Sequence, residues 1–239
     1  MAEIIAVILL AALLQGAVGF GFGLVAMPLL ALLMDAPSAA ALAALCAAVM
    51  SAVMLIQNRK GVHFGEALGL ILAAAAGIPA GVFVLAHAPR QALLISLGVL
   101  VSAFSLYSLV HPRTAELKDR RWRFAAGFFA GVLGGAYNIP GPPVVLYGAM
   151  RRWPPERFLG VTQAFFLPTG LLVMSGHAIA GFWTREVLTL FAFSLPGLVA
   201  ATFIGKRVAA RLSAETMSKA VYGLCLALGA MIVVTNLGE

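Results

Sequence analysis

Apolar residues run along the chain in eight long stretches that are separated by short polar or charged segments. In chain order these stretches are residues 4–34, 39–56, 67–86, 92–110, 124–150, 158–175, 187–203 and 217–234. Six of them have about 18 to 20 residues, the length of one helix that crosses a bilayer at about 1.5 Å per residue. The other two, 4–34 and 124–150, are longer, and glycine or proline interrupts each of them.

The two interruptions predict broken helices inside the membrane. Residues 134–143 read Gly-Gly-Ala-Tyr-Asn-Ile-Pro-Gly-Pro-Pro, and residues 16–23 read Gly-Ala-Val-Gly-Phe-Gly-Phe-Gly. Proline removes a backbone donor and glycine lowers helix propensity, so we expect new half-helices to begin at Leu24 and Val144. Broken backbone at membrane depth is tolerated only where it faces protein or a water-filled cavity, so the breaks are candidates for a binding site.

The composition indicates an all-α integral membrane protein. Hydrophobic residues make up 62% of the 239-residue chain and charged residues only 10%. We attribute the net charge of +7 to Lys and Arg held on the cytoplasmic side against anionic lipid, and we expect no nucleic-acid partner. No Lys or Arg precedes the first stretch, so we expect that stretch to be retained rather than cleaved as a signal peptide.

The distribution of Lys and Arg favours re-entrant hairpins over eight full crossings. If all eight stretches crossed the membrane, the 16 Lys and Arg residues would divide equally between the two sides. If 4–34 and 124–150 instead return to the side they left, Arg90 and Arg185 lie on one side and the remaining cations lie on the other. The second arrangement satisfies the positive-inside rule. We therefore predict six full spans and two re-entrant hairpins, with both termini outside.

The order of the stretches predicts two inverted repeats, each with one re-entrant broken helix and three transmembrane helices. The first repeat covers residues 1–112, a cytoplasmic linker covers 113–123, and the second repeat covers 124–239. Three crossings in each repeat turn the second upside down relative to the first, which is a common transporter plan.

The chemistry of the stretches favours an anionic ligand. None of the eight contains Asp or Glu, whereas cation pumps commonly keep a carboxylate at membrane depth. The two half-helix N-termini would aim free N–H groups and positive dipole ends at one central point, where backbone donors would hold an oxyanion. The alternative is that the glycines only allow close helix packing.

Several motifs resemble those of the TauE/SafE family over nearly the whole chain. They are the run 16–23 with Pro28, the run 131–143 with Tyr147, the stretch 59–64 and the stretch 205–212. The resemblance implies a membrane transporter linked to sulfite and to organosulfonates such as sulfoacetate. Phe20 and Phe22 stand where members often carry a denser glycine run, which predicts a narrower or more apolar pocket.

We expect the substrate to contact both breaks and polar side chains beside them, although buried amides could instead cap broken backbone. The predicted substrate-binding residues are Gly19, Phe20, Gly21, Phe22, Gly23, Tyr137, Asn138, Gly141, Pro142 and Gln163. His63, His87, His111 and His177 lie at the ends of stretches without metal-ligand spacing, so we expect no metal and no cofactor.

The sequence therefore predicts a multi-pass protein of the cell inner membrane. Its predicted function is secondary transport of a small sulfur-containing anion, such as sulfite, sulfoacetate or a related organosulfonate. The substrate would be held between the two half-helix N-termini near the midplane. An anion channel of the same architecture is the alternative. No grouping of catalytic side chains points to an enzyme, and a homodimer is a possible assembly.

Overall fold

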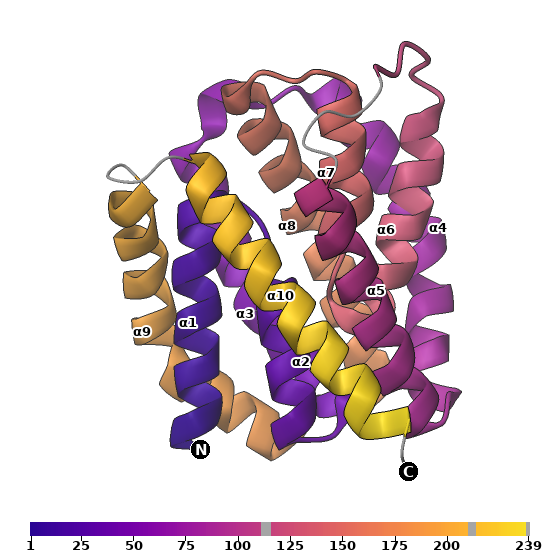
Figure 1. The fold of residues 1–239 in the computed structure, drawn as a ribbon, viewed down its shortest axis with the longest axis vertical. Coiled ribbons are helices and arrows are strands. Elements are labelled where there is room, and N and C mark those ends of the chain that lie inside the picture. The colour runs from indigo at the N-terminus through magenta and orange to yellow at the C-terminus, as the bar shows by residue number, and fades with distance from the viewer. Residues whose placement is uncertain (111–115, 210–213, 238–239) are drawn as a thin grey trace.

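The computed structural model describes residues 1–110, 116–209 and 214–237, and this part of the chain is helical (Figure 1). The predictions about His111, about the start of the linker 113–123 and about the end of the 205–212 motif concern residues outside it. The helices are α1 (Ala2–Val18), α2 (Phe22–Leu33), α3 (Ala36–Gln57), a short 3₁₀ turn η1 (Arg59–Gly61), α4 (Phe64–His87), α5 (Arg90–Val110), α6 (Trp122–Tyr137), α7 (Gly141–Met150), α8 (Pro155–Ile179), α9 (Arg185–Ala209) and α10 (Ala214–Leu237).

The predicted all-α membrane fold is confirmed. In the described residues, six helices are long and apolar enough to cross a membrane: α3, α4, α5, α8, α9 and α10. They coincide with the six predicted spans and extend a few residues beyond them. At the start of α3, for example, the Asp35 carboxylate accepts a hydrogen bond from the N–H of Ser38 at 2.9 Å, which caps residues that hydrophobicity alone leaves out.

The two long stretches are broken as predicted, but the breaks are shorter than expected. Residues 19–21 separate α1 from α2, and residues 138–140 separate α6 from α7. The predicted half-helix starts at Leu24 and Val144 are wrong, because α2 begins at Phe22 and α7 at Gly141. Prolines in the first turn of α7 lack only donors that a helix start leaves unpaired, so the helix begins ahead of them.

The first broken segment folds back to the end of the molecule from which it started. Met1 lies beside Arg185 at the start of α9. Leu32, at the end of α2, lies beside Arg90 at the start of α5. Both chain termini lie at this end of the bundle (Figure 1), which we call the terminal end.

The second broken segment folds back to the opposite end. Arg123, at the start of α6, donates to the carbonyl of Gly65 at 3.2 Å, and Tyr147 of α7 contacts Glu66. Both partners lie in the first turn of α4. The two segments therefore enter the bundle from opposite ends. Which end faces the cytoplasm stays a prediction.

Each broken segment packs along a long helix of the other proposed repeat. Helix α6 runs beside α4, and a methyl group added at Gly127, Gly131 or Gly135 would overlap the carbonyl of Leu70, Ala74 or Ile78 respectively. Helix α1 runs in the same close way beside α9, where Gly16 meets the carbonyl of Thr202. In this reciprocal pairing, the broken segment of each proposed repeat packs against a helix of the other. The inverted repeats and the boundaries 1–112, 113–123 and 124–239 stay predictions.

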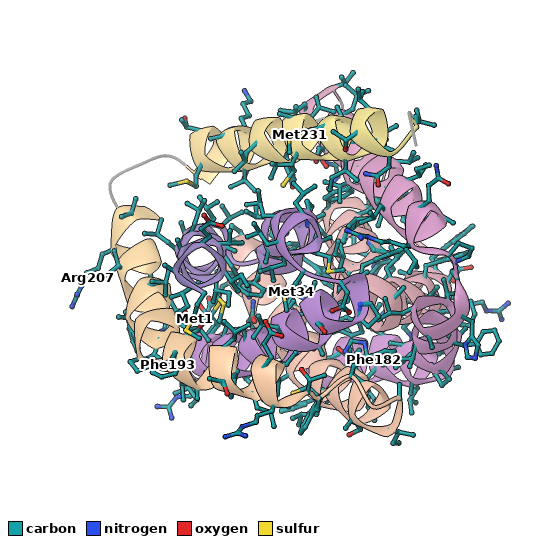
Figure 2. The ribbon with its side chains drawn as sticks, turned by 90° about the horizontal axis from the view of Figure 1, so that it is seen from below. Met1, Met34, Phe182, Phe193, Arg207 and Met231 are labelled. Atoms are coloured by element: carbon teal, nitrogen blue, oxygen red, sulfur yellow. The ribbon has the colours of Figure 1, made fainter. Side chains whose placement is uncertain are left out.

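The long helices enclose the two breaks. Seen from the terminal end, Met1 and Met34 project near the middle of the bundle, while α9, with Phe193, and α10, with Met231, lie at its periphery (Figure 2). Helix α3 is the most enclosed of the six long helices. In its apolar 18-residue segment 67% of the residues are buried, against 28–50% in the other five helices. The breaks therefore lie inside protein, as broken backbone at membrane depth requires.

Candidate functional site

The two chain breaks meet each other inside the bundle. Gly23, in the first turn of α2, lies so close to the carbonyl oxygen of Asn138 that an added methyl group would overlap it. A methyl group at Gly141 would lie 4.0 Å from the ring of Phe20. The juxtaposition that the sequence predicts is thus present in the fold, and glycine allows the two backbones to approach.

A small cavity lies where the breaks meet. Its volume is about 40 Å³, which is room for a few water molecules when one needs about 10–15 Å³. The lining comes from both broken segments and from α3, α4 and α8, and includes Gln15, Gly21, Phe22, Gly23, Leu24, Ser51, Ile78, Gly134, Asn138, Gly141, Phe166, Thr169 and Val173. A largely apolar lining with a few convergent polar groups is typical of a small-ligand site.

Asn138 provides an unpaired hydrogen-bond donor at this cavity. The residue is 5% exposed and ends α6 in a left-handed conformation with φ 53°. Its backbone N–H donates to the carbonyl of Gly134 at 2.8 Å, but its side-chain Nδ2 has no hydrogen-bond partner. Buried polar groups are almost always paired, so this amide fits a place where a ligand supplies the acceptor.

The start of α2 is less open than the sequence predicts. The Gln15 side-chain Oε1 accepts a hydrogen bond from the N–H of Phe22 at 2.8 Å. The first donor of the half-helix is therefore occupied by a side chain of the preceding half-helix. No described hydrogen bond engages the N–H groups of Gly23 and Leu24, and the positive end of the α2 dipole still faces the cavity.

The start of α7 is poor in backbone donors. Pro142 and Pro143 occupy its first turn and carry no N–H, so Gly141 and Val144 are left to donate. The backbone cradle is therefore smaller than predicted, and the Asn138 side chain carries more of the polar character of the site.

The ten predicted substrate-binding residues divide into two groups. Gly21, Phe22, Gly23, Asn138 and Gly141 line the cavity. The other five do not line it: Gly19, Phe20, Tyr137, Pro142 and Gln163. Two of these five make structural hydrogen bonds. The Gln163 amide donates to the backbone carbonyl of Gly19 at 2.7 Å, and the Tyr137 hydroxyl of α6 pairs with that of Ser96 on α5 at 2.7 Å. A role in binding stays a prediction for all ten.

Besides Gln15, two polar lining residues were absent from the ten predicted substrate-binding residues. Ser51 of α3 and Thr169 of α8 both reach the cavity. The Thr169 hydroxyl donates to the carbonyl of Phe165 at 2.6 Å, so its oxygen can still accept. Both residues lie inside plain apolar spans, and no local motif distinguishes them from ordinary core residues.

A buried carboxylate lies at the end opposite the termini. Glu66 is 5% exposed, although it lies just before the apolar stretch 67–86. Its oxygens accept from the Tyr147 hydroxyl at 3.3 Å and from Arg157 at 3.4 Å, and Arg120 lies 3.8 Å away. The cluster ties α4 to α7 and α8 at this end of the bundle. No group of three metal-ligating side chains occurs in the described residues.

Comparison with known proteins identifies the family. The family model for the sulfite exporter TauE/SafE matches residues 4–232. The chain belongs to the TauE/SafE family. Among curated proteins, this member is similar to the probable sulfite/organosulfonate exporter TauE of Cupriavidus necator, with 25% identity over 92% of this chain and 88% of the relative. No solved structure matches this TauE/SafE chain.

Proposed function

We propose that this protein is a secondary transporter that moves a small sulfur-containing anion across the cell inner membrane. Sulfite, sulfoacetate or a related organosulfonate is the substrate. The observation that carries the proposal is the unpaired, buried Asn138 amide at a cavity between the two chain breaks. The name of the Cupriavidus relative, a probable sulfite/organosulfonate exporter, supports the same class of substrate.

The substrate oxygens accept hydrogen bonds from Asn138 Nδ2 and from backbone N–H groups at the start of α2. The dipole ends of α2 and α7 favour negative charge there without a buried cation. A site built from neutral donors holds an anion firmly enough to select it and loosely enough to release it. The Ser51 and Thr169 hydroxyls complete the polar wall on the side of α3 and α8.

The attachment of the broken segments supports alternating access. The α1–α2 hairpin packs on α9, and the α6–α7 hairpin packs on α4. Rocking of one packed unit against the other opens the cavity first to one side of the membrane and then to the other. The Glu66 cluster closes the path at the end opposite the termini, and its ion pairs must separate for that end to open.

Flux of labelled sulfite and sulfoacetate in proteoliposomes tests the proposal. Asn138→Gly removes the amide but keeps a residue suited to the left-handed backbone, and Asn138→Asp adds a negative charge at the same position. We expect Asn138→Gly to weaken apparent affinity about tenfold, the value of one hydrogen bond to a charged group. We expect Asn138→Asp to abolish flux.

The control is Asn236→Gly, which removes an amide near the end of α10 that donates to the carbonyl of Ile232, away from the cavity. Unchanged flux in both Asn138 variants would refute the assigned site, and absence of flux in the wild type would refute the substrate class. Flux that rises linearly with concentration instead of saturating would identify an anion channel.

A further inference from the structure

His177 is a buried histidine that the transport cycle described so far does not use. It is 0% exposed in the last turn of α8. The sequence pattern placed it beyond the end of the span 158–175, but α8 continues to Ile179 and encloses it. A fully buried titratable side chain inside a membrane helix is a candidate for a functional role.

The hydrogen bonding of His177 fixes its tautomer. The Nε2 atom lies 2.9 Å from the carbonyl oxygen of Gly135. A carbonyl oxygen only accepts, so Nε2 carries the proton and donates it. The other ring nitrogen, Nδ1, is buried without a hydrogen-bond partner. In the neutral imidazole Nδ1 holds a free lone pair, which is the place where a second proton binds.

The position of His177 connects it to the anion cavity. Val173 lines the cavity one turn earlier on the same face of α8, and Gly134, the neighbour of Gly135, also lines it. No titratable side chain is among the lining residues. His177 therefore lies just beyond the neutral cavity, toward the terminal end, and its Nε2–H caps the last turn of α6.

Burial among apolar residues disfavours a charge on His177, whereas its hydrogen bond to the end of α6 favours one. The negative end of the α6 dipole lies at Gly135 and stabilises an imidazolium. On α4, Val82 packs beside the neighbouring Gly176. Toward the terminal end, Phe182 covers the ring at a centroid distance of 5.6 Å. No described charged side chain forms an ion pair with His177.

We propose that His177 is the proton-binding residue that couples proton binding to anion binding in this transporter. This inference rests on the proposed function. A proton on Nδ1 places a positive charge near an anion in the cavity. If the two charges are on the order of 10 Å apart, the attraction at an effective dielectric constant of about 20 corresponds to roughly a tenfold gain in anion affinity. By linkage, the anion raises proton affinity by the same factor, so both are bound together.

Sulfoacetate binding to the purified full-length protein tests the inference, because the charge of this ligand does not change near neutral pH. In the wild type we expect proton uptake on binding in weakly buffered solution. We also expect affinity roughly tenfold higher at about pH 5 than at about pH 8, the range in which histidine changes charge. His177→Gln keeps an N–H for the Gly135 carbonyl but cannot take up the proton. It should bind sulfoacetate with no proton uptake and no pH dependence.

His87→Gln is the matched control, since exposed His87 also pairs through a ring nitrogen with a backbone carbonyl, that of Phe83, at 2.9 Å. It should behave as the wild type does. Wild-type binding without proton uptake, or undiminished uptake in His177→Gln, would overturn the role of His177 and leave the proposed transport intact. If the wild type binds no sulfoacetate but transports sulfite, only the inference about His177 is overturned. If it neither binds sulfoacetate nor transports either anion, both are overturned.

A second measurement does not depend on the folding of a His177 variant. The chain has four histidines, so carbon-13 labelling of histidine gives four ring signals in the wild-type protein. Gln substitutions at the other three positions assign the fourth to His177. Its signal should move to the imidazolium position when sulfoacetate is added, and a signal that stays in place would refute the proposal.

Discussion

Asn138 occupies a backbone conformation that glycine adopts at lower cost. Its φ of 53° lies in the left-handed region, where asparagine is tolerated and most other side chains are strained. Glycine would make the same turn between α6 and α7. The presence of an amide there, with its Nδ2 buried and unpaired, is better explained by a donor function than by the turn alone.

Gln15 is a second residue whose side chain serves the broken backbone. It pairs with the N–H of Phe22 and so closes the gap between α1 and α2. Gln15→Met keeps the side-chain length but removes the acceptor, which leaves a buried N–H unpaired at a cost of about 1–3 kcal/mol. We expect a lower midpoint of thermal unfolding in detergent, measured by circular dichroism.

Gln91→Met makes the same chemical change at the exposed start of α5, where the amide donates to the carbonyl of Asn236. This variant should unfold within about 0.5 kcal/mol of the wild type, as ordinary surface substitutions do. Equal midpoints for the two variants would show that the Gln15–Phe22 bond contributes nothing to stability.

The lining residues within the breaks could be found from the sequence, and those contributed by the long helices could not. Asn138 stands out because it interrupts an apolar stretch next to glycine and proline. Ser51 and Thr169 lie in continuous helices, and only the packing of α3 and α8 against the breaks brings them to the cavity. The burial of Glu66 likewise depends on partners far along the chain, Tyr147 and Arg157.

At the scale of the helices, glycine determines how closely α6 approaches α4. Gly131→Ala would bring a methyl group onto the carbonyl of Ala74. The two helices must then move apart, which costs about 1–3 kcal/mol in a well-packed interior. We expect a loss of thermal stability of that size and reduced flux, because α6 carries Asn138 into the site.

Gly223→Ala is the matched control, since an added methyl group there would meet nothing within 4 Å. Alanine also has the higher helix propensity, by about 0.5–1 kcal/mol, so this variant should be as stable as the wild type or more stable. A Gly131→Ala protein with wild-type stability would contradict the close packing of α4 and α6.

Hydrophobic length was sufficient to predict the six long helices, because a bilayer sets their minimum extent. It could not predict where the half-helices begin. Gly134 and Gly135 were expected to end a helix, yet α6 continues through both to Tyr137. For Gly135 the reason is contact with α4 at Ile78, a tertiary interaction that outweighs intrinsic propensity.

At the scale of the whole molecule, the fold-back of the broken segments predicts which helix ends lie on the same side of the membrane. Ser38→Cys, at the start of α3, and Ala2→Cys, at the N-terminus, should react with a membrane-impermeant maleimide from the same side of intact cells. Glu116→Cys should react from the other side. We expect the first pair to be labelled from outside, in keeping with the positive-inside rule.

The native cysteines do not interfere with this labelling, because Cys46 and Cys225 are both 0% exposed. The unsubstituted protein supplies the background. Labelling of Ser38→Cys and Ala2→Cys from opposite sides would mean that the first stretch crosses the membrane fully, and would reject the re-entrant arrangement.

The reciprocal pairing of α1 with α9 and of α6 with α4 has a consequence for biosynthesis. A ribosome releases α1 first, but the surface of α9 that receives Gly16 is made almost two hundred residues later. Helix α6, in contrast, is made after α4, so its partner is already present in the bilayer. The α6–α4 contact can therefore form as soon as α6 is made, whereas the N-terminal hairpin lacks its α9 contact until α9 has been synthesised.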